Sequence, residues 1–426
     1  MRLDASDPGF AEAFTALVEA RREADADLSR DVAAIVARVR AEGDAALREH
    51  TQRFDRHDLD HGGWEVSKAE RQAALGGLDA ELRAAIELAA ERISAYHAAQ
   101  KPEDRDATDA AGVRLGARWR AVDAAGLYVP GGRAAYPSTV LMNAIPARAA
   151  GVERLVMVTP TPDGIVNPLV LAAAEIAGVD EVWRIGGAQA IAALAYGTER
   201  IAAVDVIVGP GNAWVAEAKR QLYGVVGIDM VAGPSEIVVV ADGANDPEWI
   251  AADLLSQAEH DPTSQSILFT DDADFADRTA AAVERQLGAL ATGATARAAW
   301  EANGAIIVVP SPDAAMPLVD RLAPEHLELA VDDPEALFAR VRHAGSVFLG
   351  RYTPEAVGDY IAGPNHVLPT GRRARFASGL SVLDFMKRTS FIACDAGSLA
   401  KIGPAAVALA KAEGLPAHAA SVAVRL

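Results

Sequence analysis

The N-terminal quarter of the chain spaces its apolar and charged positions as an amphipathic helix does. In the stretch 28–55, Val32, Ile35 and Val39 lie three or four residues apart, with charged residues between them. The stretch 80–99 repeats this pattern. Because a helix brings positions three and four apart onto one face, both stretches are predicted to be helices that bury one apolar side. Residues 1 to about 110 are therefore expected to be helical.

A different pattern begins at Gly126, where short apolar runs each end in a turn of glycine or proline. The runs are LYVPGG, RLVMVTPTP, EVWRIGG and VDVIVGPGN. Helical patterns separate them, and strands that alternate with helices indicate βαβ units in a parallel sheet. The loops after the strands then share one edge of that sheet, where open α/β folds bind ligands.

A second alternation of strands and helices follows, from the run SEIVVVAD to GSVFLG. One of its helices is predicted over residues 316–330. The chain then continues with a glycine-rich loop, AGPNHVLPTG, a polar stretch and a helical tail, GPAAVALAKAEG. The expected fold class is α/β, with two Rossmann-like layers and short helical segments at both ends.

Charge excludes one class of partner. The chain has 426 residues, with 40 Lys and Arg against 59 Asp and Glu, so its formal net charge is −19. A chain this acidic is not expected to bind nucleic acid or an anionic membrane through bulk electrostatics. Hydrophobic residues make up 51% of it, which is typical of a globular protein.

Cysteine content and apolar run lengths indicate the compartment. Cys394 is the single cysteine, so no disulfide can form within the chain, which suits a reducing compartment. No apolar run approaches the roughly 18 residues that a membrane span needs. The first ten residues have no apolar core and are not expected to act as a secretory signal. We therefore expect a soluble, cytoplasmic protein.

The strand-end loops offer polar groups for a nucleotide, but without the usual phosphate-binding motif. The chain has no G-x-G-x-x-G; GPGN, at residues 209–212, lacks a third glycine at the required offset. Tyr128, Gln189 and Asn212 remain as side chains that could contact a ligand from these loops. On the residues alone, ordinary turns of an α/β fold explain these loops equally well.

A helix that ends in Gln257 and His260 is a candidate metal site. Asp246 is a good N-cap and Pro247 a good first residue, and Pro262 limits the far end. Gln257 and His260 are three residues apart, so they project from one face of the last turn, where a metal ion could bind both. The alternative is a helix end with solvated polar residues.

Glu325 and His326 are adjacent and form a candidate acid–base pair. On the predicted helix they would point about 100° apart and could serve two successive proton transfers on different atoms. Imidazole is a suitable base at neutral pH. The alternative is a helix-start glutamate beside a surface histidine.

Two further segments combine a carboxylate with an imidazole. Asp359 precedes a Gly-Pro-Asn-His loop that contains His366. Glu413 and His418 flank a Gly-Leu-Pro turn in the tail, a segment that usually frays unless something holds it. The other histidines lie in charged stretches and are interpreted as solvent-facing: His50, His57, His61, His97 and His343.

At these residues the sequence resembles the histidinol dehydrogenase family, over nearly its whole length. The segments that carry the resemblance, all in family order, are YVPGG, IGGAQAIAALAYGT, GPGNAWV, AGPSEI, LLSQAEHD, APEHLEL, GPNHVLPT, SGLSVLDF and AEGLPAHA. The resemblance implies oxidation of L-histidinol to L-histidine through L-histidinal, with two NAD⁺, one water and one Zn²⁺ per subunit. Trp214 stands where a smaller aromatic residue is expected, which affects packing near the cofactor.

The resemblance also implies roles for single residues. Glu325 and His326 match the catalytic pair. Gln257, His260, Asp359 and His418 match the zinc ligands. Tyr128, Gln189 and Asn212 are assigned to NAD. The substrate is expected to lie among the metal-site residues, His326 and three others: Ser235, His366 and Glu413.

The family fold implied here has two incomplete Rossmann-like domains in an intertwined homodimer, whose C-terminal segment contributes to the partner's site. The implied division begins with an N-terminal helical segment, residues 1–28. Residues 29–127 and 236–379 would form a discontinuous first domain, and residues 128–235 a second domain on the NAD side. Residues 380–426 would form a C-terminal tail. His418 and Glu413 would then act in trans.

Two alternatives remain open. The first is a related dehydrogenase on the same scaffold that oxidises another small polar alcohol to its acid. The second is a zinc- or ligand-binding protein that has lost the chemistry, against which the intact Glu325–His326 pair speaks. Cys394 belongs to none of the site segments, so it is interpreted as structural, and direct hydration of bound histidinal is expected rather than a covalent thiol adduct.

Overall fold

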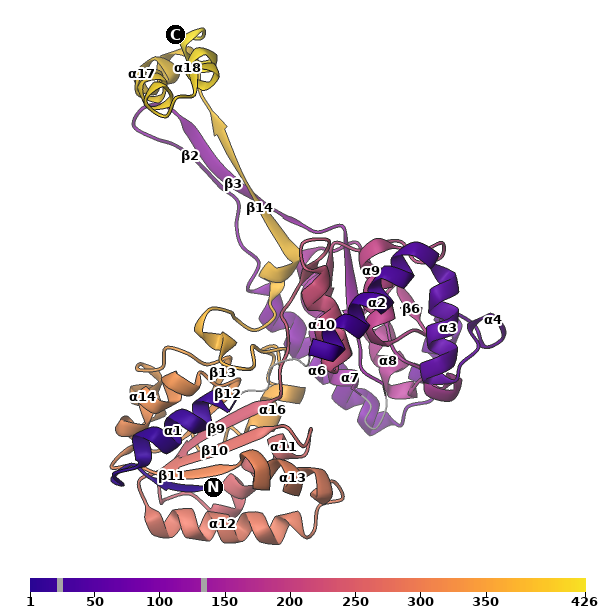
Figure 1. Ribbon diagram of the computed structural model, residues 1–426, viewed down its shortest axis with the longest axis vertical. Helices are drawn as coiled ribbons and strands as arrows, with labels where there is room; N and C mark the ends of the chain where they lie inside the picture. The colour runs from indigo at the N-terminus through magenta and orange to yellow at the C-terminus, as the bar shows by residue number, and fades with distance from the viewer. Residues whose placement is uncertain (21–25, 132–135) are drawn as a thin grey trace.

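The chain folds into two α/β lobes and a long arm that projects away from both (Figure 1). The computed structural model describes residues 1–20, 26–131 and 136–426. One lobe is built on a six-stranded parallel sheet, the other on a five-stranded parallel sheet, and the arm on a three-stranded antiparallel sheet. The predicted α/β fold with two parallel sheets is confirmed.

The first lobe has helices on both faces of its sheet, whose strand order is β1-β11-β10-β9-β12-β13. Its strands are β1 Arg2–Asp4, β9 Glu236–Ala241, β10 Gln265–Thr270, β11 Ala305–Val308, β12 His326–Ala330 and β13 Ser346–Leu349. Its helices are α1 Phe10–Glu19, α11 Pro247–Ala258, α12 Ala273–Leu287, α13 Gly293–Asn303, α14 Pro312–Leu322, α15 Pro334–Phe338 and α16 Glu355–Tyr360. Val238 and Val240 of β9 join one core, whereas Ile237 and Val239 join the other. A strand that is apolar on both sides is typical of a covered parallel sheet.

The second lobe has the strand order β6-β5-β4-β7-β8. Its strands are β4 Ala124–Tyr128, β5 Arg154–Val158, β6 Glu181–Trp183, β7 Val206–Val208 and β8 Gly227–Ile228. Its helices are α2 Ala26–Glu42, α3 Asp44–Asp55, α4 Leu59–Gly62, α5 Lys68–Gly76, α6 Ala80–Ala98, α7 Pro137–Ala150, α8 Pro168–Ile176, α9 Gly187–Tyr196 and α10 Ala213–Leu222. Leu155 and Met157 of β5 face one core, and Val156 and Val158 face the other.

The packing differs from the expected division of the chain. Residues 29–127 were grouped with 236–379, but the apolar faces of α2 and α3 pack against α9 and share a core with β7 of the second lobe. The first residues, grouped as a separate segment, pair β1 with β11 and so extend the first lobe's sheet. The reason is that the apolar side chains of α2 and α3 point toward the five-stranded sheet. Periodicity predicts that a helix has an apolar face, but it does not specify which sheet that face packs against.

One helix boundary predicted from the sequence is confirmed, and another is wrong. Helix α11 begins as predicted, with the Asp246 side chain accepting the Glu248 N–H. The helix predicted over 316–330 is wrong beyond Leu322, and β12 begins at His326. Ala323 has a left-handed conformation (φ 46°), and Pro324 disfavours helical geometry in the residue before it. Glu325 and His326 therefore lie at the start of a strand.

Three of the histidines interpreted as solvent-facing are buried, so that interpretation is wrong for them. They are His50, His57 and His97. His97 lies on the inner side of α6, where its Nδ1 is 2.9 Å from the Ile93 carbonyl oxygen. His57 Nε2 is 3.2 Å from the Gly63 carbonyl oxygen. His61 is exposed, as expected. An amphipathic helix accepts an imidazole on its inner side when a backbone carbonyl satisfies one ring nitrogen.

The arm is a narrow antiparallel ribbon that ends in a pair of helices (Figure 1). It consists of β2 Arg105–Thr108, β3 Arg114–Ala121, β14 Met386–Ala393, α17 Ala396–Ala412 and α18 Pro416–Ala423. β14 lies in the segment described above only as a polar stretch. Large apolar side chains are exposed along the arm, among them Ile392, Leu409 and Val424. In the described ranges no helix is long and apolar enough to cross a membrane.

A buried ion pair fixes the loop after β7. Lys219 of α10 pairs with Asp229, and the two side chains are only 3% and 1% exposed. Lys219 Nζ donates to the Gly209 carbonyl oxygen at 3.0 Å, and Asp229 Oδ2 accepts the Gly209 N–H at 2.8 Å. The pair therefore holds both sides of one residue in the GPGN loop.

We predict that Lys219→Met destabilises the protein by about 3–5 kcal/mol, because it leaves Asp229 buried without its partner charge. Urea unfolding at fixed protein concentration measures this. The control is Arg83→Met, which breaks an exposed pair with Glu87 and should cost about 1 kcal/mol or less. The double variant Lys219→Met/Asp229→Asn should recover part of the loss. Equal stability of the Lys219 and Arg83 variants would contradict the assignment.

Candidate functional site

A cavity of about 460 Å³ lies at the carboxyl edge of the five-stranded sheet. Tyr128 ends β4, Gln189 lies in the first turn of α9, and Asn212 caps α10, and all three side chains line this cavity. The structure therefore brings together the three residues expected to contact NAD. Its other lining residues are Ile35, Phe54, Asp55, Pro130, Gly131, Pro160, Pro162, Gly186, Gly187, Ala188 and Trp214.

Close backbone packing builds the floor of this cavity. Gly209 has φ +111°, and a Cβ there would lie 2.2 Å from the Tyr128 carbonyl oxygen, so only glycine fits. The Tyr128 hydroxyl accepts the Gly187 N–H at 3.2 Å, and burial raises the pKa of Tyr128 to about 12. The phenol therefore stays protonated and can donate a hydrogen bond to a ligand. Gly132, the last residue of YVPGG, lies outside the described residues.

A second cluster lies at the amino edge of the six-stranded sheet, where β9 and β12 begin. Glu236 is the first residue of β9 and His326 the first of β12. The Glu236 N–H donates to Glu325 Oε2 at 2.9 Å, and His326 Nδ1 lies 3.0 Å from the Glu236 carbonyl oxygen. One residue of the neighbouring strand thus orients both members of the candidate pair.

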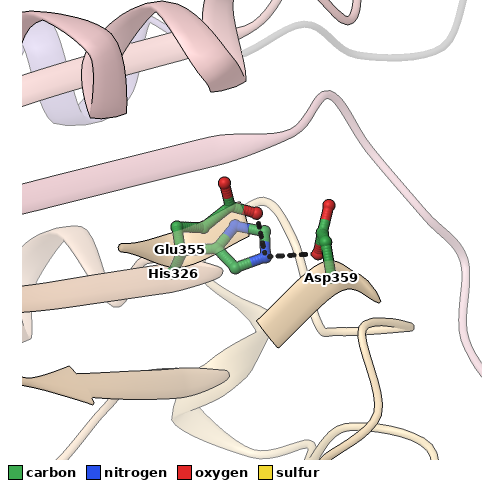
Figure 2. A group of neighbouring side chains, drawn as sticks. All are labelled: His326, Glu355 and Asp359. Atoms are coloured by element: carbon green, nitrogen blue, oxygen red, sulfur yellow. Dashed lines mark ion pairs between the residues drawn. The ribbon is translucent and has the colours of Figure 1, made fainter. Parts of the chain in front are cut away.

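His326 is a buried imidazole with a free basic nitrogen. A carbonyl oxygen can only accept, so Nδ1 carries the proton and Nε2 carries the lone pair. Nε2 lies 3.6 Å from Glu355 Oε1 and 3.9 Å from Asp359 Oδ1 (Figure 2). Burial lowers the pKa of His326 to about 3, and the nearby imidazoles of His260 and His366 add to this effect. The ring is therefore neutral at physiological pH.

The pKa of Glu325 is shifted upward, opposite to that of His326. The Glu325 side chain is buried, and burial raises its pKa well above the ordinary value, with the nearby carboxylates acting in the same direction. The Glu236 N–H bond opposes that rise without cancelling it. Glu325 Oε2 is 3.7 Å from His326 Nδ1, too far for a hydrogen bond. The two groups are therefore neighbours that can act separately.

Helix α16 brings Glu355 and Asp359 beside His326, and sequence reasoning missed Glu355. The two carboxylates are four residues apart and share one face of the helix. Gly358 allows the close approach, because a Cβ there would lie 2.5 Å from the Phe348 ring of β13. Burial raises the pKa of both carboxyl groups, and for Glu355 the charge of Asp359 adds to the rise. The spacing E-x-x-x-D was the available signal.

Four other expected site residues belong to the first lobe: Ser235, Gln257, His260 and His366. His366 Nδ1 is 3.0 Å from the Asp359 backbone oxygen, and burial lowers the pKa of His366 to about 4. Gln257 is buried in the last turn of α11, and the exposed His260 follows the end of that helix. Ser235 immediately precedes β9.

Glu413 and His418 do not join the cluster within one chain. Glu413 caps α17 and His418 belongs to α18; both are exposed. These helices lie at the far end of the arm, well away from α16 and β12 (Figure 1).

The donor atoms of the cluster fit a divalent metal ion. His326, Glu355 and Asp359 offer ligand atoms that all lie within 4.8 Å of one another. Within the described chain, Gln257 Oε1, His326 Nε2 and Glu355 Oε1 are buried without a hydrogen-bond partner. Buried polar atoms are normally paired, and a bound ion would satisfy His326 Nε2 and Glu355 Oε1, which lie 3.6 Å apart. Mixed nitrogen and oxygen donors are those zinc accepts.

Known proteins resemble the chain throughout its length. A family model described as Histidinol dehydrogenase matches residues 18–426. A histidinol dehydrogenase of Zymomonas mobilis is 67% identical over 426 residues, covering 100% of this chain and 99% of that protein. One of Rhodospirillum rubrum is 63% identical over 427 residues, covering 100% and 98%. The crystal structure of histidinol dehydrogenase from Elizabethkingia anophelis matches with a TM-score of 0.95 at 37% identity, covering 100% and 97%. The chain belongs to the histidinol dehydrogenase family.

Proposed function

We propose that the protein oxidises L-histidinol to L-histidine through L-histidinal, with NAD⁺ as the hydride acceptor and one Zn²⁺ per subunit. The observation that carries the proposal is the pair Glu325 and His326. The same residue of β9 orients both side chains, but burial raises the pKa of Glu325 and lowers the pKa of His326. Two successive oxidations of one carbon need two bases, and this pair supplies them.

Four side chains would hold the metal: Gln257, His260, Asp359 and His418 of the partner subunit. This set shares only Asp359 with the cluster of His326, Glu355 and Asp359 described above, so that His326 stays free to act as a base. Only Asp359 among the four is anionic, so the ion keeps a net positive charge. Bound zinc supplies a Lewis-acidic anchor for the imidazole and amine nitrogens of histidinol. Ser235, His366 and Glu413 would complete the substrate's surroundings, and the cavity of Tyr128, Gln189 and Asn212 would bind NAD.

In the first oxidation, His326 Nε2 would take the proton of the substrate hydroxyl, and NAD⁺, when bound, would supply the hydride acceptor. The fixed proton on Nδ1 keeps Nε2 available as the acceptor. Burial excludes bulk water around this nitrogen, which favours its neutral form.

In the second oxidation, Glu325 would take a proton from the water that adds to the aldehyde carbon, and a second NAD⁺, when bound, would supply the acceptor for the second hydride. The raised pKa of this carboxyl makes it a stronger base once it is ionised. Cys394 is exposed next to the end of β14 and has no chemical role in the proposal, so water adds directly to histidinal.

We infer that the active form is an intertwined homodimer. A single chain leaves α17 and α18 at the end of a projecting arm and exposes Leu409 and Val424 there. Insertion of the arm into a second copy would cover these side chains and bring His418 to the partner's metal site.

We predict that metal-stripped protein forms no NADH from L-histidinol and that added Zn²⁺ restores two NADH per histidinol. The stoichiometry follows from two hydride transfers on one carbon. Absorbance of NADH against consumed substrate measures it. Zinc binding without NADH formation would instead favour a related dehydrogenase with another substrate.

A mixing experiment tests the shared site. His326→Asn and His418→Asn should each inactivate the enzyme, whereas co-expression of the two variant chains should restore about a quarter of wild-type activity. Half of the dimers formed at random are hybrids, and one of the two sites in each hybrid is intact. Purified single variants mixed only in the assay provide the control for exchange. Absence of restored activity in isolated hybrid dimers would place His418 in its own chain's site.

We predict that Glu325→Gln slows oxidation of supplied L-histidinal by about 100-fold or more while sparing the first oxidation. In the native enzyme the histidinal rate should rise with pH, because a group with a raised pKa becomes an ionised base only as pH increases through that pKa. The glutamine variant should lose this rise. Stopped-flow NADH formation from each substrate across pH measures both effects. Equal loss of both oxidations would contradict separate bases.

A further inference from the structure

The loop after α16 lies against the second lobe, although it connects two expected site residues of the first. Asp359 belongs to the last turn of α16, and His366 follows the loop, with its Nδ1 3.0 Å from the Asp359 carbonyl oxygen. Val367 belongs to the core that contains the apolar residues of α6 and α7, and Ile361 packs against that core. Residues 361–367 therefore connect the metal and substrate residues of one lobe to the packing of the other.

A proline leaves a carbonyl of α7 without its helical partner, and the loop supplies a replacement. Pro146 lies inside α7 and has no N–H, so it cannot bond to the carbonyl of Met142, four residues earlier. Met142 is buried, and a buried carbonyl without a donor is costly. Instead Asn365 Nδ2 donates to the Met142 carbonyl oxygen at 2.5 Å. A side chain next to His366 thus completes a helix of the second lobe.

The Asn365 amide uses both of its ends, so its orientation is set. Its Oδ1 accepts the Val367 N–H at 2.9 Å, while its Nδ2 faces α7. A backbone N–H can only donate and a carbonyl can only accept, so the reverse orientation would lose both bonds. Asn365 is 7% exposed, and water therefore competes little for these bonds. The amide holds the backbone from which the His366 ring projects.

Arg92 of α6 holds the other end of the loop. Its Nε donates to the Ile361 carbonyl oxygen at 2.7 Å, and its Nη2 donates to the Ala362 carbonyl oxygen at 3.2 Å. Ile361 directly follows α16, where the last carbonyl groups of a helix have no partner within it. A guanidinium presents its N–H groups in a rigid fork, so it fixes two adjacent carbonyls together. Asp359 lies two residues before this point.

We propose that Asn365 and Arg92 are positioning residues through which the second lobe fixes Asp359 and His366 for the metal and the substrate. This inference rests on the zinc dependence proposed above. Ligands that are already held in place lose less conformational freedom when a metal binds, and groups that orient ligands commonly change metal affinity by 10- to 100-fold. Asn365→Ala is therefore expected to weaken Zn²⁺ binding by about tenfold or more.

A double variant separates positioning from stability. Asn365→Ala leaves the Met142 carbonyl without a donor, so it also destabilises the protein. Pro146→Ala returns an N–H to that turn of α7 and should recover stability, but it leaves the loop untethered. In Pro146→Ala/Asn365→Ala we expect stability to recover while Zn²⁺ affinity stays low. Urea unfolding measures the first, and competition with a chromogenic chelator on the full-length protein measures the second. Recovery of both would show that Asn365 only completes α7 and would overturn the proposal.

A matched pair of variants on α6 tests the other contact. Arg92→Met and Arg83→Met remove the same charge from the same helix. Arg83 bonds to Glu87 on the exposed face of α6 rather than to the loop. We expect only Arg92→Met to weaken Zn²⁺ binding. Equal Zn²⁺ affinities of the two variants would overturn the role of Arg92.

Coenzyme binding distinguishes a local effect from a general one. Among the described residues that line the proposed NAD cavity, none belongs to the loop 361–367, so Asn365→Ala should bind NAD⁺ as the native protein does. A parallel loss of NAD⁺ and Zn²⁺ affinity would show a general loosening of the fold and overturn the inference. Zn²⁺ binding that is equal in native protein and Asn365→Ala would overturn the inference alone. If the native protein binds no Zn²⁺, the proposed zinc dependence falls and the inference falls with it.

Discussion

The backbone of Glu236 is the constraint on which the arrangement of Glu325 and His326 depends. Its N–H binds the Glu325 carboxylate and its carbonyl accepts from His326 Nδ1. The parallel pairing of β9 with β12 sets that register, placing His326 opposite Ile237. Because a carbonyl cannot donate, the imidazole tautomer is decided by the backbone rather than by another titratable group. The His326 ring is thereby oriented by a backbone carbonyl at the start of the strand that pairs with its own.

The cavity lies at the carboxyl edge of one sheet, and the cluster of Glu325 and His326 lies at the amino edge of the other. The five-stranded sheet uses the loops after its strands, as open α/β folds usually do. The six-stranded sheet instead gathers Glu325, His326 and Glu236 where its strands begin, and α11 reaches the cluster with its C-terminal turn. The proposed coenzyme site and the proposed proton-transfer pair can therefore be tuned separately: one by glycines that admit a ligand, the other by burial that shifts pKa values.

Local signals in the sequence predicted much of this arrangement. Strand runs ending at glycine predicted the parallel sheets, and Asp246 with Pro247 predicted the start of α11. The resemblance of short segments to the histidinol dehydrogenase family pointed to residues that line one cavity in the structure, such as Tyr128 and Asn212. The sequence did not reveal Glu355, because its relevance depends on how closely α16 approaches β13. The pairing of β14 with β3, more than 250 residues apart along the chain, likewise leaves no local signal.

The arm also constrains the order in which the protein can mature. β3 and β14 form one ribbon, but Met386 follows its partner Ala121 only after both lobes have been synthesised. Domains generally fold as units during synthesis, N-terminal parts first. Each lobe can therefore fold its core during synthesis, whereas the three-stranded ribbon of the arm can form only after β14 has been synthesised. Until then β3 keeps an open strand edge, and the homodimer proposed above would assemble only after β14 has paired with that edge.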